Sequence, residues 1–438
     1  AARRGHSERD HVNAGVDTAR RLGWALLLAL AACAAAAPQK REPHVGYLYP
    51  AGGQIGTTFE VIVGGQFLAG EAQIRFSTNG VSAKVIKHYR QVRFVSGDQR
   101  EALIRRMVEV REKRRGELPK GAKIPPYPGE RMLPAAKPGG AEKNPEGAKE
   151  PPKELPDHPS LRNMDDKNLR ELQAIAVELL DWESAQKRQP NAQISEMLLI
   201  EVTIAPNAAA GRRELRVLTP LGVSNPITFE VGAWPETQEQ EPNEPGACPY
   251  LPEPEPLTPP FVLNGQILPG DVDRVRIRAR KGQRLVFDAH ARRLIPFLAD
   301  AVPGWFQATL TLYDDQGREV AFADDYRFDP DPVLLYEVPR DGVYEMEVRD
   351  AIYRGREDFV YRVAVGEAPF ITEAFPLGGR IGVRTVAAID GWNLPAKTIE
   401  FDTTPGMETI RAAALGVEKA LTNRVTYAVD TLPEVFEA

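Results

Sequence analysis

Six side chains with oxygen donors lie in two short segments of the chain and could together hold a hard cation. They are Glu239, Glu241, Asn243 and Glu244 in the first segment, and Asp271 and Asp273 in the second. Calcium in proteins takes about six to eight oxygen ligands, mostly from carboxylates and amide carbonyls. Side chains of these types could therefore supply ligands for calcium. The alternative interpretation is a solvated acidic linker followed by a Gly-Asp-x-Asp turn that Asx hydrogen bonds close.

The sequence carries none of the short motifs that mark common catalytic sites. It has no Gly-x-Ser-x-Gly elbow, no His-Glu-x-x-His helix and no phosphate-binding glycine loop. Its two cysteines, Cys33 and Cys248, are too few for a disulfide framework or a thiolate zinc site. The histidines outside the first forty residues have no partner at metal-ligand spacing; they are His44, His88, His158 and His290. We therefore expect a chain that is not an enzyme.

Trp305 and Phe306 belong to a dense aromatic and apolar cluster that also includes residues 294–297. One interpretation is a recognition loop for a protein or a polysaccharide. The other is a loop tucked over the edge of a folded domain, where the same side chains serve the core.

The composition is that of a soluble globular protein with several domains. The chain has 438 residues, of which 42% are hydrophobic and 26% charged, and its formal net charge is -6. At roughly 150 residues per domain this length suggests about three domains. The composition excludes a polytopic membrane protein and a wholly disordered one. Because there is no basic excess to neutralise phosphates, we expect no nucleic-acid partner.

Residues 1–40 read as an upstream segment and an export signal. Arg20 and Arg21 precede a short apolar run from Leu22 to Ala37 that ends in small residues. Three outcomes stay open: cleavage near Ala37, acylation of Cys33 within a Leu-Ala-Ala-Cys sequence that resembles a lipobox, and retention as a membrane anchor. We predict an exported protein, periplasmic, at the cell surface or extracellular, that meets a membrane only through this signal or a lipid.

An internal repeat indicates the architecture. The sequence from Tyr49 to Gly56 returns from Phe375 to Gly382, and Gly65-Gln-Phe-Leu and Gly391-Trp-Asn-Leu follow at identical spacing. The pattern resembles the start of TIG-type immunoglobulin-like domains, which implies two immunoglobulin-like domains at residues 41–232 and 367–438. After the second copy, the Pro-Glu sequence near the end matches the acidic linker that follows the first. We expect the chain to be part of a longer repeat protein, or a shortened homologue of one.

The first immunoglobulin-like domain is expected to carry an insertion at about residues 95–192. Two amphipathic helical stretches, with Asp165 and Asp166 as candidate N-caps of the second, flank a proline-rich tract at 119–159. That tract has too few apolar residues to bury, so we predict disorder there. The basic side chains of the first stretch are either a docking site for an acidic partner or a solvated face beside the second helix.

A proline- and glutamate-rich linker at 233–260 leads into a run of short alternating strands. The motifs of this region are Glu-Pro-Asn-Glu, Asn-Gly-x-Ile, Gly-Asp-Val-Asp, Lys-Gly-Gln-x-Leu-Val, Leu-Tyr-Asp-x-x-Gly, Asp-Gly-x-Tyr and Tyr-Arg-Val. Together they resemble the bacterial pre-peptidase C-terminal domain over residues 239–366.

The resemblance implies a non-catalytic β-sandwich of jelly-roll type and a calcium site. In similar collagen-binding modules, a Glu-x-Glu-x-Asn-Asp segment and an Asp-containing turn bind the ion. The residues that match the first segment are Glu239, Glu241, Asn243 and Glu244, and those that match the turn are Asp271 and Asp273. Glu244 departs from the pattern, because it stands where the family has Asp.

The sequence thus predicts a mainly β chain of tandem antiparallel sandwiches: immunoglobulin-like with a helical and disordered insertion, jelly-roll, and immunoglobulin-like. The predicted function is non-catalytic binding or presentation at or outside the bacterial cell envelope, with an extracellular protein, polysaccharide or matrix as partner and calcium as the only cofactor. The alternatives are an accessory part of a secreted protease or other hydrolase, and a lipoprotein scaffold tethered through Cys33.

Overall fold

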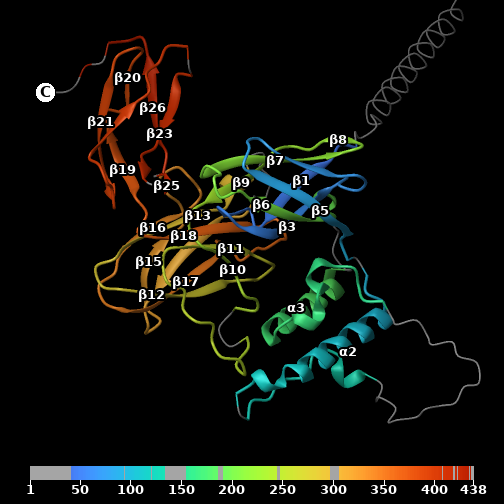
Figure 1. The fold of residues 1–438 in the computed structure, drawn as a ribbon. Helices are drawn as coiled ribbons and strands as arrows, with labels where there is room; N and C mark the ends of the chain where they lie inside the picture. The colour runs from blue at the N-terminus through green and yellow to red at the C-terminus, as the bar shows by residue number, and fades with distance from the viewer. Residues whose placement is uncertain are drawn as a thin grey trace, which may run out of the picture. The chain divides into compact units, whose positions relative to one another are not determined.

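The computed structural model describes residues 41–438 except 93, 120, 134–153, 186–190, 244–246, 296–304, 407, 418–419, 422, 434 and 436–438 (Figure 1). The predicted export signal, Cys33 and Glu244 lie outside the described residues. Within them the chain is mostly β, and the predicted fold class of sandwiches with a helical insertion in the first is confirmed. No helix among the described residues is long and apolar enough to span a membrane.

The first sandwich is built from residues on both sides of the helical insertion. One sheet has the order β1-β3-β6-β5, and the other has the order β2-β9-β7-β4 with β8 paired to β7. The strands are β1 (His44–Tyr49), β2 (Gly52–Gln54), β3 (Thr58–Gln66), β4 (Gln73–Phe76), β5 (Val81–Arg90), β6 (Glu196–Ile204), β7 (Gly211–Thr219), β8 (Gly222–Val223) and β9 (Ile227–Gly232). Val61 and Val63 of β3 are fully buried while Glu60 is exposed, so the period-two alternation of the sequence selects the core face.

The insertion folds as two helices with a core of their own. α2 (Gly97–Lys113) begins at a capping box formed by Ser96 and Gln99, and α3 (Leu169–Ala185) packs against it. Short 3-10 helices flank them: η1 (Arg115–Glu117), η2 (Glu130–Met132), η3 (Pro159–Leu161), η4 (Met164–Asp166) and η5 (Ala192–Ile194). Among the basic side chains of α2, Arg100 pairs with Glu183 of α3 and Lys113 with Asp165.

Two details of the insertion differ from the sequence predictions. The α3 cap is Asn168, whose Oδ1 accepts the N–H groups of residues 170 and 171, because Asp165 is engaged by Lys113 instead. The prediction of disorder across 119–159 is wrong for residues 121–133, since Tyr127 is buried and its ring lies under the Arg111 guanidinium. Residues 134–153 lie outside the described part of the chain.

The second sandwich pairs a five-stranded sheet, β10-β11-β18-β13-β16, with a four-stranded sheet, β12-β17-β14-β15. The strands are β10 (Glu236–Gln238), β11 (Phe261–Gln266), β12 (Asp273–Ala279), β13 (Arg284–His290), β14 (Ala308–Tyr313), β15 (Glu319–Ala323), β16 (Val333–Glu337), β17 (Gly342–Asp350) and β18 (Val360–Gly366), and η6 (Arg292–Leu294) follows β13. The predicted linker is therefore partly structural: β10 pairs in parallel with β11, because Glu236 is held by Asn264 and Arg362.

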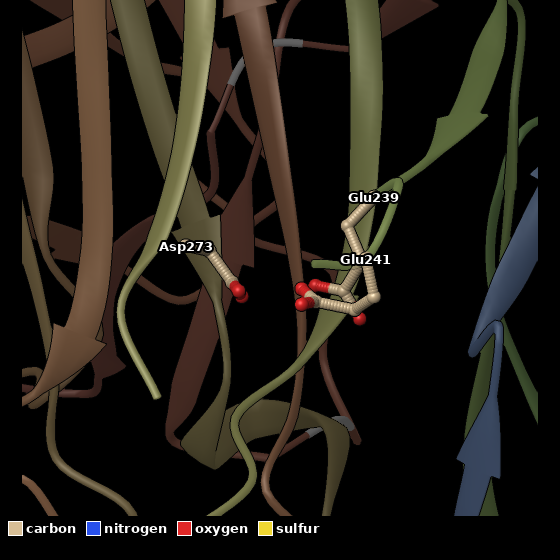
Figure 2. Close-up of side chains that lie close together, drawn as sticks. All are labelled: Glu239, Glu241 and Asp273. Carbon is tan, nitrogen blue, oxygen red and sulfur yellow. The ribbon is translucent and has the colours of Figure 1, made fainter. Parts of the chain in front are cut away.

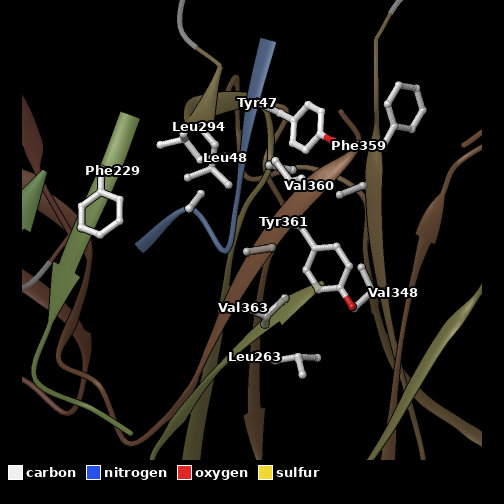
Figure 3. Packing of buried hydrophobic residues seen from close by; sticks show 14 of the residues in the cluster. Tyr47, Leu48, Phe229, Leu263, Leu294, Val348, Phe359, Val360, Tyr361 and Val363 are labelled. Carbon is white, nitrogen blue, oxygen red and sulfur yellow. The ribbon is translucent and has the colours of Figure 1, made fainter. Parts of the chain in front are cut away.

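One buried apolar cluster runs through the first and second sandwiches. It joins Phe229 of β9 and Leu48 of β1 to Leu263 of β11 and Val363 of β18 (Figure 3). Burial of apolar surface contributes roughly 25 cal/mol per Å². The shared cluster therefore contributes to holding these two sandwiches together.

The third domain repeats the first in its pairing register. Its sheets are β19-β21-β22 and β20-β26-β23, with a separate β24-β25 hairpin. The strands are β19 (Phe370–Phe375), β20 (Gly378–Arg380), β21 (Thr385–Trp392), β22 (Thr398–Phe401), β23 (Ile410–Ala413), β24 (Gly416–Val417), β25 (Ala420–Leu421) and β26 (Val425–Asp430). The β1–β3 and β19–β21 ladders carry a bulge at the same place.

The bulge of each copy is clamped by an equivalent asparagine. Asn225 binds the backbone N–H of Val45 at 2.8 Å and its C=O at 2.9 Å, and Asn423 does the same to Ile371 at 2.6 and 2.9 Å. The repeat seen in the sequence is therefore a repeat of structure.

Candidate metal centre

Three acidic side chains meet where the segment after β10 crosses the start of β12. Ligand atoms of Glu239, Glu241 and Asp273 all lie within 4.8 Å of one another, and the three carboxylates point toward a common centre (Figure 2). Asp273 is fully buried, and the two glutamates are half-buried. We call these three residues the carboxylate cluster.

Two tyrosines and a backbone amide hold the cluster in place. Tyr361 Oη donates to Asp273 Oδ2 at 2.6 Å, and Tyr49 Oη donates to Glu239 Oε1 at 3.1 Å. The Gln266 N–H donates to both oxygens of Glu239, at 2.9 and 3.1 Å. A Cβ at Gly265 would collide with the Tyr361 ring and the Glu239 carboxylate, so the glycine of the Asn-Gly motif is what admits them.

The other predicted ligands lie near the carboxylate cluster in different states. Asn243 Nδ2 donates to Asp273 Oδ1 at 3.0 Å and to Glu241, while its Oδ1 accepts the Arg274 N–H at 3.3 Å. Asp271 is buried and accepts the Leu268 N–H at 3.2 Å as part of its turn. The structure thus brings three of the six predicted ligands to one point, with Asn243 directly beside them.

The cluster resists ionisation. Burial, and then the neighbouring Asp273 and Glu241 carboxylates, raise the pKa of Glu239 well above its usual range. Burial also raises the pKa of Asp273, although hydrogen bonds such as that from Tyr361 partly oppose it. At neutral pH the cluster therefore needs a proton or a cation to relieve its charge.

The donor chemistry of the cluster fits a hard divalent cation such as calcium. All the donors are carboxylate oxygens, each with two lone pairs, so the oxygens that accept hydrogen bonds from Tyr49 or Tyr361 can still coordinate. A soft metal would prefer sulfur or imidazole, and neither is in the cluster. Asn243 would add a carbonyl ligand only after its amide turns over, because its nitrogen now faces the carboxylates.

A second group of charges lies nearby, between the first two sandwiches; Arg362 is buried and the other three side chains are half-buried. Glu230 of β9 contacts His290 Nδ1 at 2.7 Å and Arg362 Nε at 3.4 Å, and Asp288 contacts His290 Nε2 at 3.2 Å. We call Glu230, Asp288, His290 and Arg362 the charge-balanced cluster. It contains two acids and two bases.

Opposite charges dominate the ionisation of this second cluster. Burial by itself would raise the pKa of Glu230, but His290, Arg362 and Arg293 outweigh it and lower the pKa to about 2. Burial would lower the pKa of His290, but Glu230 and Asp288 raise it to about 10. Glu230 and His290 are therefore both charged at neutral pH.

The described histidines do not form a catalytic triad with the groups they contact. His158 Nδ1 lies 2.7 Å from Ser160 Oγ and 3.1 Å from Glu178 Oε1, so one nitrogen faces both groups. A triad needs the hydroxyl and the acid on opposite ring nitrogens. Both ring nitrogens of His290 face carboxylates.

Trp305 and Phe306 lie in the core of the second sandwich. They are 9% and 3% exposed, and their rings pack against Phe359 at centroid distances of 5.6 and 5.2 Å. In the described part of the chain these rings are not presented to solvent.

Several residues of the two clusters could not be assigned from the sequence. Tyr361 and Arg362 belong to the Tyr-Arg-Val motif, and Tyr49 to the repeat, but nothing in their spacing shows that they face Glu239 or Glu230. Only the alternation of a strand could have separated these two residues. Tyr361 and Arg362 are consecutive in β18, so their side chains point to opposite faces of the sheet.

No family model matches the chain, and no curated protein matches it. Among solved structures, the chain is similar to the pre-peptidase C-terminal domain of a Bacillus anthracis collagenase, with 12% identity over 26% of this chain and 98% of that chain and a TM-score of 0.19. It is similar to the secreted serine protease VesC of Vibrio cholerae, with 10% identity over 40% of this chain and 36% of that chain and a TM-score of 0.17.

A third likeness is to the C-terminal domain of the Streptococcus agalactiae antigen I/II polypeptide BspA, with 7% identity over 86% of this chain and 95% of that chain and a TM-score of 0.16. The collagenase domain bears the family name that the sequence motifs suggested. At such low TM-scores, however, these likenesses establish neither a family nor a function. What the chain does must be inferred from its own residues.

Proposed function

We propose that this chain is an exported, non-catalytic binding protein of tandem β-sandwiches, in which the carboxylate cluster holds a calcium ion. The observation that carries the proposal is the convergence of Glu239, Glu241 and Asp273 within 4.8 Å in the interior of the second sandwich. Export is supported by the arginine-led apolar run at residues 20–37.

The contacts of the cluster favour a cation over a merely solvated acidic linker. Glu239 is held from three sides, by Tyr49, by the Gln266 N–H and by Tyr361. A solvated glutamate would not be fixed in this way beside a fully buried aspartate. Three carboxylates gathered in a low-dielectric interior repel one another, and a divalent cation removes that repulsion.

The ion would act as a clasp between two parts of the second sandwich. Glu239 and Glu241 follow β10 of the five-stranded sheet, and Asp273 opens β12 of the four-stranded sheet. A cation bound to all three fixes the segment after β10 against the other sheet. Tyr49 connects this point to the first sandwich through its hydrogen bond to Glu239.

The test is a calcium titration of the full chain followed by thermal unfolding. Extracellular modules bind calcium with dissociation constants of about 0.1–1 mM, so a titration to about 10 mM covers the range. At a hundredfold excess over the dissociation constant, stabilisation of about 2.7 kcal/mol is expected. Isothermal titration calorimetry of the same protein gives the stoichiometry, for which we expect at least one ion.

Matched variants assign the effect to the cluster. Asp273→Asn removes one charge while keeping the side-chain shape, and should abolish the calcium shift. Asp324→Asn changes an exposed aspartate of the same sandwich and should leave the shift unchanged. A melting temperature that ignores calcium, or a shift that survives Asp273→Asn, would contradict the proposal.

A non-catalytic role is supported by the contacts of His158 and His290, since neither histidine holds an acid and a hydroxyl on opposite ring nitrogens. The alternative function is an accessory part of a secreted hydrolase. Incubating the full chain with casein and with gelatin, with and without calcium, tests the non-catalytic role, because release of peptides would show a hydrolase in the chain itself. The reading frame of the source gene separates the two candidate functions, because an accessory part would be encoded together with a catalytic domain.

A further inference from the structure

A cleft lies between the helix α3, the strand β2 of the first sandwich and the strand β10 of the second. Its volume is about 830 Å³, within the range of about 300–1,000 Å³ that is typical of ligand sites. Its walls include residues 52–54 of β2, residues 236–238 of β10, and Ala174 and Val177 on one stripe of α3. We call this cavity the edge cleft.

Both strands that border the edge cleft stand at the end of their sheets. Among the described strands, β2 pairs only with β9 and β10 only with β11, and both pairings are parallel. A strand at the edge of a sheet presents N–H and C=O groups that its own ladder does not use, and these groups can pair with another chain.

The bonds at the two ends of the β10–β11 ladder show which residues of β10 face outward. The Pro235 C=O and the Glu239 N–H bond to β11, at 2.8 and 3.0 Å, and Thr237 between them pairs with the same strand. Along a strand, residues that bond to one neighbour alternate with residues whose backbone points the other way. Glu236 and Gln238 therefore direct their N–H and C=O groups to the open edge.

The strand β2 is arranged in the same way on the opposite wall. Its outward residues are Gly52 and Gln54, because residues 51 and 55 bond to β9. Arg362 covers one face of Gly52 and the Phe59 ring covers the other face at Gly53, since an added Cβ would collide with each. The edge is thus the side of β2 that is left to the cleft.

The charges that line the edge cleft are mostly negative and are divided between its ends. Six carboxylates and two cations line it, and the excess remains when calcium neutralises the two that belong to the carboxylate cluster. The cations are Lys167 and Arg170 at the start of α3, where backbone carbonyls after β10 hold Arg170. Further along α3 the lining charges are Glu178 and Asp181, beside the exposed Val177. This end of the cleft favours a basic side chain.

We propose that the edge cleft binds an extended peptide of another protein, which pairs with β10 as an added strand and places a lysine or arginine beside Glu178 and Asp181. Outward backbone groups recognise an extended chain of any sequence, and the side chains of the cleft then select among sequences. Apolar side chains of the peptide lie against Val177 and Phe59. This inference names the partner class of the proposed binding role and rests on that role, but it does not depend on the calcium ion.

Fluorescence anisotropy of the full chain with a labelled peptide of seven alternating valines and lysines tests the proposal. Strand addition draws its affinity from main-chain bonds, so a generic extended peptide is a suitable probe. Saturable binding with a dissociation constant of about 10–100 µM is expected, since few backbone bonds form. Glutamates in place of the lysines of the probe should weaken binding at least about tenfold.

Two variants of the exposed Gln238 test the backbone contact. Gln238→Pro removes the outward N–H, which the β10–β11 ladder does not use, and should weaken binding about tenfold. Gln238→Ala keeps this N–H and should bind the probe as the wild-type chain does. Thermal unfolding of both variants shows that the sandwich remains folded. Equal affinities of the two variants would contradict an added strand at β10.

Two variants of α3 test the side-chain contact independently. Val177→Lys places a positive charge beside Glu178 and Asp181 and should weaken binding of the lysine probe at least about tenfold. Leu180→Lys is the matched control, because Leu180 is 45% exposed against 46% for Val177 but does not line the cleft. An equal loss in both variants would overturn the proposal.

The same titrations with and without calcium separate this proposal from that of the calcium site. A calcium-binding chain that shows no saturable peptide binding in either buffer overturns the peptide proposal alone. Peptide binding by a chain whose stability ignores calcium supports it, while the calcium site fails.

Discussion

The carboxylate cluster and the charge-balanced cluster both place acidic side chains in or beside the second sandwich, but they differ in the charge of the neighbouring groups. Glu230 and Asp288 lie against His290 and Arg362, and the lowered pKa of Glu230 shows that the bases outweigh burial. Glu239 and Asp273 lie against each other, and their pKa values are raised. In the charge-balanced cluster each acid has a cationic partner within the chain, whereas the negative charge of the carboxylate cluster is relieved only by a proton or a bound cation.

Burial of acidic side chains is therefore not by itself a sign of a ligand site. What separates the two clusters is the charge of the groups that shift each pKa. His290, Arg362 and Arg293 act on Glu230, whereas the leading influences on Glu239 after burial are Asp273 and Glu241. Removing one member should therefore have opposite effects in the two clusters when calcium is absent.

The largest effect is expected from His290→Gln. It removes the shared partner of Glu230 and Asp288. Because these side chains are 18% and 23% exposed, the cost should stay at or below the value of about 3–5 kcal/mol for a fully buried pair. Guanidinium unfolding of the full chain, followed by tryptophan fluorescence, measures the loss. His88→Gln is the matched control: at a similar side-chain exposure it has one carboxylate partner, Glu196, instead of two, so the change should cost about 1 kcal/mol or less. A loss from His290→Gln no larger than that of the control would remove the distinction between the clusters.

A smaller effect of opposite sign is expected from Asp273→Asn in a calcium-free buffer. The asparagine oxygen still accepts from Tyr361, and one of three mutually repelling charges is gone, although the new amide nitrogen faces the donor Asn243 Nδ2. Because burial raises the pKa of Asp273 and so disfavours its charged form, we expect a net stabilisation smaller than the effect of His290→Gln. In saturating calcium the same variant should be the less stable protein. Destabilisation in both buffers would mean that the cluster is not short of positive charge.

The smallest effect is expected from pH. A carboxyl with a raised folded pKa binds its proton in the folded state first, so the calcium-free chain should gain stability as pH falls from its folded pKa toward the unfolded value of 4.5 for Glu239. His290, raised from 6.5 to about 10, contributes fully below pH 6.5 and loses its contribution as pH rises toward 10. Of the two clusters, only the carboxylate cluster therefore changes between pH 6.5 and 5. His44, whose pKa is lowered by burial, acts in the opposite direction in this interval.

The expected gain over that interval is about 1 kcal/mol, and Asp273→Asn should reduce it. Melting temperatures in matched calcium-free buffers at pH 6.5, 5.75 and 5 provide the measurement. Stability that falls over this range in the wild-type chain would contradict the raised pKa values of Glu239 and Asp273.

Much of the fold could be predicted from the local alternation of apolar residues and from the internal repeat. The exceptions depend on contacts between segments that are distant in the sequence. The alternation of Val61 and Val63, and the repeat from Tyr49 to Gly56, predicted the strands and the two related domains. Tyr127 is the exception that a composition argument misses: one ring in a proline-rich tract is enough to anchor it when Arg111 and the helical core lie beside it.

The site was only partly accessible to sequence reasoning. The acidic residues of the carboxylate cluster could be identified from their type and spacing. Their partners could not, because Tyr49, Gly265 and Tyr361 come from strands far apart in sequence. The charge-balanced cluster was missed entirely, since neither Glu230 nor His290 stands in a motif.

The place where the helical insertion enters has a consequence for how the first sandwich assembles. β5 and β6 are neighbours in one sheet, and Arg90 pairs with Glu196 where a short hairpin turn would normally stand. Closing a loop becomes costlier with length, by about 0.6 kcal/mol for each doubling, and a distant pairing forms late in folding. The helices α2 and α3, by folding on their own core, draw the two ends together. If the two helices form first, they shorten the effective loop between β5 and β6. The rate at which these strands pair then depends on how early α2 and α3 pack together.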